Sequence, residues 1–301
     1  MEDEKLLKYG VHLMNTDNKG EAVKVFTVLA NSKDDGMKLQ AYDALLSILD
    51  QIKDYKVIMI LCDNGIKISQ AQKRMDNLAY FQMRKASAMS IKIGGWKYVR
   101  KMFKLSPDWF GFATEEEQKR YKELDEKIED NEKQVDILCL ESLTNAELAN
   151  NKKLLGMIYL CRSPIWKNRY SDLRVEQLIR TIGFLPHGRF RDMMEYSKKD
   201  LRRIDHYDRE AVSDLKKAIN IFQEIGDNDS ISYCLNNLAN HYLYSYRYIE
   251  AFITLKKLEK SIKGTNDQEL LRNLKLLKSR LFTLNRNIPN YIEDYKDYVS
   301  E

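Results

Sequence analysis

Apolar side chains recur every three or four positions through the first part of the chain, the spacing that gathers them on one face of a helix. The first two stripes, 6–13 and 22–29, are separated by polar, turn-forming residues. The further helices that this pattern predicts span residues 41–52, 57–66, 71–93 and 96–105. Gly94-Gly95 is predicted to separate the last two. Short polar links between such helices predict antiparallel, up-and-down pairs and an all-α fold.

Two of the predicted helix pairs share a motif of small and large residues. The first helix of each pair carries a large residue, then a large and a small residue side by side, then another large residue, and the next helix carries a small and a large residue four positions apart. The motif occurs as Leu6-x2-Tyr9-Gly10-x2-Leu13 with Ala22-x3-Phe26, and as Leu235-x2-Leu238-Ala239-x2-Tyr242 with Ala251-x3-Leu255. Small residues let two helices approach closely, and the large ones fill the space between them.

This motif resembles the tetratricopeptide repeat (TPR). The turns at Lys19 and Lys53 are 34 positions apart, which is the length of one such repeat. Ala218-x3-Phe222 is similar to the second helix of a further repeat. The resemblance implies a TPR-like α-solenoid of antiparallel helix pairs, with roughly 12 to 15 helices and a concave binding face. An irregular helical bundle is the alternative interpretation.

The middle of the chain carries neighbouring blocks of opposite charge. Residues 115–150 hold 12 acidic and 5 basic side chains, whereas residues 152–217 hold 16 basic and 9 acidic ones. Thr114 and Glu117 match a capping box, which predicts that a helix begins there. The residues predicted to interrupt the basic block are Pro164, Gly183 and 186–188.

These features divide the chain into three predicted regions. They are N-terminal TPR-like repeats over 1–106, an irregular charged helical middle over 107–188, and C-terminal TPR-like repeats over 189–301. A last hairpin is predicted at the end of the chain, with arms at 269–284 and 291–298.

The composition excludes several other classes of protein. Only 12 Gly and 4 Pro occur in 301 residues, which is few for the turns of a sandwich or barrel. The longest apolar run, 57–62, is too short to cross a bilayer, and the acidic start shows no secretory signal. The four cysteines lie far apart in sequence, which predicts free thiols and a cytoplasmic protein.

No set of residues converges on a reaction in the sequence. The four histidines lack the spacings of a zinc site, and no G-x-S-x-G motif marks a nucleophile. Gly94-Gly95 lacks the Lys-Ser/Thr of a phosphate-binding loop. We therefore expect no metal, no cofactor and no catalytic residue, and predict that the protein is not an enzyme.

Asparagines in a late predicted helix are candidates for binding. Asn is a poor helix former, so Asn237 and Asn240 need another reason to be there. The TPR resemblance implies that both line the concave groove, where an amide donates to and accepts from an extended peptide. Tyr244 and Arg272 are predicted to extend this surface. A hydrogen bond from each amide to a neighbouring helix is the alternative.

Two hypotheses of function follow. The first is a non-enzymatic adaptor or regulatory sensor that binds a protein or peptide on the concave face of the solenoid. The alternative is a nucleic-acid-binding protein that uses the basic block around 188–217, where aromatic residues are interleaved with cations. The candidate basic residues are Arg189, Arg191, Lys198, Lys199, Arg202 and Arg203. A solvated helix face, or an internal contact with the acidic block 115–150, would also account for them.

Overall fold

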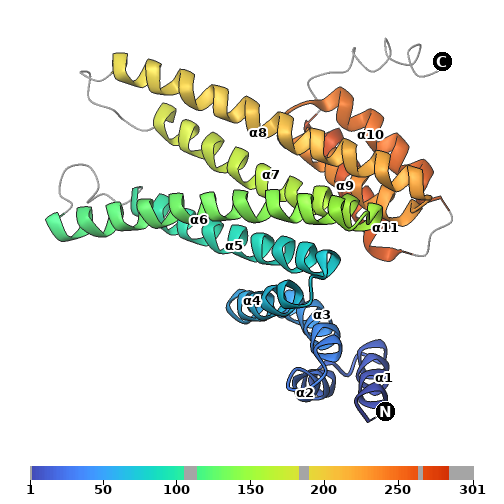
Figure 1. The fold of residues 1–301 in the computed structure, drawn as a ribbon. Coiled ribbons are helices and arrows are strands. Elements are labelled where there is room, and N and C mark those ends of the chain that lie inside the picture. Colours follow the sequence, from blue (N-terminus) through green and yellow to red (C-terminus); the bar gives the residue numbers. More distant parts are fainter. Residues whose placement is uncertain (1, 105–113, 183–189, 264–266, 285–301) are drawn as a thin grey trace. The chain divides into compact units, whose positions relative to one another are not determined.

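The computed structural model describes residues 2–104, 114–182, 190–263 and 267–284. It describes their side chains except those of 101–104, 172, 174–200 and 284. Eleven helices and no strand occur in this part of the chain, so the predicted all-α fold is confirmed (Figure 1). The helices are α1 (Glu2–Asn15), α2 (Lys19–Leu29), α3 (Asp35–Ile52), α4 (Tyr55–Ala71), α5 (Met75–Lys104), α6 (Glu115–Leu148), α7 (Lys152–Ile182), α8 (Phe190–Ile225), α9 (Asn228–Tyr244), α10 (Tyr248–Ser261) and α11 (Gln268–Leu284).

The helices form two compact units. The first unit is Met1–Cys161 and the second is Arg162–Glu301, so the boundary falls within α7. The two boundaries predicted from the sequence, near 106 and 188, both fall outside the described residues. The division into three regions therefore stays a prediction.

In the first unit each helix packs against the next, from α1 to α6, as in a stack of antiparallel pairs. The core is centred on Phe26, Leu46, Ile58 and Phe81, which are almost fully buried. At Gly10 an added Cβ would lie 2.8 Å from two ring atoms of Phe26. Gly10 and Phe26, a small and a large residue of the first motif, thus meet as the motif predicts, because only a glycine lets α1 approach α2 this closely.

Two predicted helix breaks are wrong. Gly94-Gly95 lies inside α5, and Pro164 lies inside α7. Two Gly residues cost a helix only about 2 kcal/mol together, and the turn after Gly95 is fixed by an ion pair of 2.7 Å between Lys97 and Glu132 of α6. Pro164 is exposed, whereas its neighbours on both sides are buried, so packing holds α7 across a residue that costs a helix about 3 kcal/mol or more.

The acidic helix α6 begins at the predicted capping box. The Thr114 hydroxyl accepts from the backbone N–H of Glu117 at 3.2 Å, and the Glu117 carboxylate accepts from the backbone N–H of Thr114 at 2.8 Å. Part of its charge is matched by α5, since Arg100 lies 2.7 Å from Asp125 in addition to the pair at Lys97. Cations of α5 therefore neutralise part of the negative charge of α6.

In the second unit α9 is central, because it packs against α8, α10 and α11. Its core contains Leu215, Phe222, Leu255 and Leu258, all nearly inaccessible to solvent. The first arm of the predicted last hairpin is α11, and the second arm, 291–298, lies outside the described residues. No helix in the described part of the chain is long and apolar enough to cross a membrane.

Candidate peptide-binding face in the second unit

Three of the four predicted binding residues share one face of α9. Asn237, Asn240 and Tyr244 are three and four positions apart, so their side chains leave the helix on the same side. Asn237 and Asn240 are half-buried, and Tyr244 is exposed. The amide oxygen of Asn240 is buried and has no hydrogen-bond partner among the described residues, and the same holds for Asn236. A buried acceptor left unpaired costs about 1–3 kcal/mol, so this face is short of donors.

One cation, Lys167, reaches this face, and a second, Arg280, acts on it electrostatically. The ammonium nitrogen of Lys167 in α7 lies 4.3 Å from the ring centre of Tyr244. Burial, and then the positive charge of Arg280 in α11, lower the pKa of Lys167. Neither cation has a carboxylate partner among the described residues. Two neighbouring positive charges without a counter-ion form a place where an anionic group would be stabilised.

The position of α11 beside α9 is fixed at its other end. The Tyr233 hydroxyl donates to a carboxylate oxygen of Asp267 at 2.8 Å, and the other oxygen of Asp267 accepts from the N–H of Leu270 in the first turn of α11. Arg272, the fourth predicted binding residue, is exposed one turn further along α11. Sequence reasoning missed Lys167 and Arg280, because nothing in their local sequence distinguishes them from the other cations of the chain.

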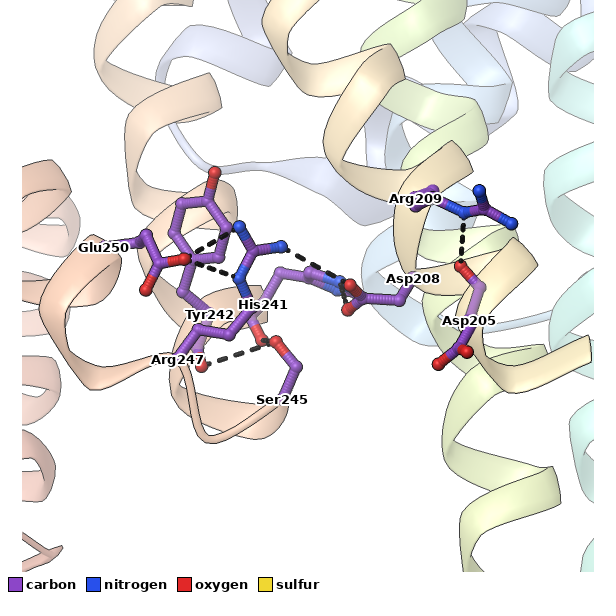
Figure 2. A network of polar contacts seen from close by, with 8 residues as sticks. All are labelled: Asp205, Asp208, Arg209, His241, Tyr242, Ser245, Arg247 and Glu250. Carbon is purple, nitrogen blue, oxygen red and sulfur yellow. Dashed lines mark hydrogen bonds and ion pairs between the residues drawn. The ribbon is translucent and has the colours of Figure 1, made fainter. Parts of the chain in front are cut away.

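A polar network joins α8, α9 and the start of α10 (Figure 2). Nε2 of His241, which is 1% exposed, lies 2.8 Å from Oδ1 of Asp208, and Arg247 reaches the other oxygen at 3.4 Å. Arg247 also donates to Glu250 at 2.8 Å, and its guanidinium lies 4.6 Å from the ring centre of Tyr242. The network pins the turn between α9 and α10 to α8. Sequence reasoning missed this network, because Asp208 and His241 are 33 positions apart.

Acid is expected to loosen this network through Asp208. Burial raises the pKa of Asp208, but the hydrogen bond with His241 and the charge of Arg247 outweigh it, so the pKa lies below its ordinary value. Such a carboxylate stabilises the fold above its unfolded pKa of about 3.9, and this contribution is lost as the pH falls through the lower, folded pKa. The gap in urea midpoint between wild type and Asp208→Asn is therefore expected to shrink from about pH 6 to about pH 3. A gap that stays constant over that range would contradict this assignment.

A second set of polar contacts lies deeper, between α7 and α8. Asp214 is completely buried and accepts two hydrogen bonds of 2.6 Å from the guanidinium of Arg162. The indole N–H of Trp166 donates to the same carboxylate at 2.9 Å. Three of the roughly four acceptor sites of the Asp214 carboxylate are therefore occupied, which suits the group to holding α7 on α8.

The predicted basic patch is only partly described. Arg202 and Arg203 are exposed on α8. Arg189 lies outside the described residues, and so do the side chains of Arg191, Lys198 and Lys199. The basic patch therefore stays a prediction.

Reactive groups are scarce in the described part of the chain. No group of three or more His, Cys, Asp or Glu side chains is arranged to hold a metal ion there. All four cysteines are free thiols. Burial raises the pKa of Cys62 to about 12 and also raises the pKa of Cys161, which keeps both thiols protonated.

No family model matches the sequence, and a search of the curated proteins finds no match. The class of the protein is therefore defined by its fold, which is an all-α stack of helix pairs in each unit.

Proposed function

We propose that the protein is a TPR-like, non-enzymatic adaptor or regulatory sensor that binds a peptide segment of another protein. The binding face is formed by α7, α9 and α11. The observation that carries the proposal is Lys167, whose ammonium nitrogen lies 4.3 Å from the ring centre of Tyr244 and which has no carboxylate partner in the described structure, while the positive charge of Arg280 acts on it. A ligand that brings an acidic group to this place would relieve the repulsion between the two cations.

The asparagines of α9 complete the proposed site. The half-buried side chain of Asn240 would contact the backbone of an extended peptide, to which an amide can donate and from which it can accept hydrogen bonds. Asn237, one turn earlier on the same face, would contact the next part of the peptide, and the Tyr244 ring offers it an apolar surface. The proposed ligand is therefore an extended peptide with an acidic side chain or a terminal carboxylate.

The test is selection of 12-residue phage-displayed peptides on the full chain. We expect acidic peptides to be enriched, and the best of them to be measured by fluorescence polarisation. Lys167→Glu should weaken binding by about 10-fold or more, since the change adds a like charge to the acidic ligand. Asn237→Ala with Asn240→Ala should also weaken it. Lys56→Glu, an equal charge change on an exposed residue of α4, should leave the affinity unchanged.

Two results would contradict the proposal. One is a selected peptide whose affinity is the same for wild type, Lys167→Glu and the double asparagine variant, with circular dichroism showing all three folded. The other is binding of a fluorescent 20-nucleotide RNA that falls steeply with salt and is lost in Arg202→Glu with Arg203→Glu, while no peptide is enriched. That second result would favour the nucleic-acid alternative.

A further inference from the structure

A groove of about 840 Å³ lies on the opposite side of α9 from the peptide-binding face. On α9 it is lined by Ile231, Leu235, Leu238 and Tyr242, whose spacing of three and four positions marks one helix face. Asn237, Asn240 and Tyr244 line no part of it. The walls come from α8 on one side and α10 on the other, so we call this the α8–α10 groove.

The groove combines an apolar floor with a basic rim. Ile219 of α8, Ile231 of α9 and Ile253 of α10 are half-buried and leave apolar surface open inside the groove. The charged residues that line the groove are Lys216, Glu250, Lys257 and Lys260. Glu250 is already paired with Arg247 at 2.8 Å.

The three lysines of the rim have no counter-ion in the described structure. Lys216, Lys257 and Lys260 are exposed, and none of them forms an ion pair or hydrogen bond with a described residue. Other lysines of α10 and α11 differ, since Lys278 lies 2.6 Å from Glu259. The rim thus carries cations without partners on both walls, beside apolar surface, and its complement is a ligand with acidic groups flanking an apolar stripe.

The length of the groove fits a short helix. Along α10 it runs from Glu250 to Ser261, which at 1.5 Å per residue is about 17 Å, or three turns. A helix laid in a groove presents apolar side chains at positions i, i+3, i+4 and i+7, and its outer flanks are free to carry carboxylates. A nucleic-acid backbone carries charge but no apolar stripe, so the floor would stay unmatched.

We propose that the α8–α10 groove is a second docking site, which binds an acidic amphipathic helix of a partner protein. The apolar stripe of this partner helix covers Ile219, Ile231 and Ile253, and the carboxylates of the helix pair with the lysines of the rim. The site is separate from the proposed peptide-binding face, so either proposal stands if the other fails.

The experiment measures binding of a designed probe to the full chain by fluorescence polarisation. The probe is a 14-residue amphipathic helix with leucines on one face and glutamates on its flanks, and the control probe has lysine in place of every glutamate. We expect the acidic probe to bind, and the triple variant Lys216→Glu, Lys257→Glu, Lys260→Glu to weaken it about 10-fold or more at low salt. The lysine probe should show the reverse preference.

The matched control is a second triple variant with the same change in net charge. Lys256→Glu, Lys263→Glu and Lys275→Glu alter exposed lysines of the same unit that do not line the groove, and they should leave binding unchanged. Equal binding of the acidic probe to wild type and to the groove variant would overturn the proposal.

The chain itself contains a competing occupant. Residues 291–299 carry apolar side chains at helical spacing together with Glu293, Asp294 and Asp297. If wild type fails to bind the acidic probe, but Glu293→Lys, Asp294→Lys, Asp297→Lys binds it, the groove belongs to this segment and the proposal of an external partner is wrong. Failure of both proteins to bind the probe would also overturn it.

Discussion

Replacing Asp214 by Asn is expected to lower the free energy of unfolding by about 3–5 kcal/mol. Asp214 is fully buried, and the side chain of Arg162 is only 13% exposed. The substitution keeps the size of the side chain but removes its charge, so the buried guanidinium of Arg162 loses the carboxylate to which it donates two hydrogen bonds of 2.6 Å. Trp166 keeps an acceptor only if the new amide oxygen turns towards its indole N–H. Urea unfolding followed by circular dichroism would measure the change.

Two controls separate the lost charge from a general effect of substitution on α8. Asp205→Asn alters an exposed aspartate of the same helix and should cost less than about 0.5 kcal/mol. Replacing both partners, as Arg162→Met with Asp214→Leu, should recover most of the loss, because no buried charge then remains unpaired. If Asp214→Asn is as stable as wild type, the pair does not hold α7 on α8.

The helices could be predicted from the sequence because their signals are local. Apolar spacing, turn residues and the capping box at Thr114 located helices α1 to α4 and the start of α6. The breaks at Gly94 and Pro164 were predicted from intrinsic preference alone, and packing overrode that preference. Intrinsic preference is worth about 1–3 kcal/mol at these residues, which the burial of neighbouring side chains readily offsets.

The residues of the candidate sites likewise could be predicted where the signal lies within one helix, and not where it depends on the packing of several helices. Asn237, Asn240 and Tyr244 were predicted together because their register within one helix is visible in the sequence. Lys167 and Arg280, and the two walls of the α8–α10 groove, come from helices far apart in the chain. Their proximity depends on how α8, α10 and α11 pack around α9 and on the contact of α7 with Tyr244, and no local pattern in the sequence predicts it.

The second large effect is expected at Phe26, the large residue of the first motif. Phe26 is completely buried on α2, and Phe26→Ala should cost about 3–5 kcal/mol, because the ring leaves a cavity that the surrounding helices cannot fill. The loss should appear as faster hydrogen exchange in the backbone of α1 and α2, measured by mass spectrometry, and as a lower urea midpoint. Unchanged exchange in both helices would contradict the assignment of Phe26 to the core of this pair.

The contact between Gly10 and Phe26 makes a sharper test of the motif. Gly10→Ala alone should destabilise by about 1–3 kcal/mol, since the new Cβ would lie 2.8 Å from the ring. Gly95→Ala is the matched control, because nothing lies within 4 Å of its added Cβ, and it should stabilise α5 by up to about 1 kcal/mol. Combining Gly10→Ala with Phe26→Leu should cost less than the sum of the two single changes, because the smaller side chain makes room for the methyl group. Strict additivity would mean that the two residues do not set the distance between α1 and α2, and the packing argument for the motif would then fail.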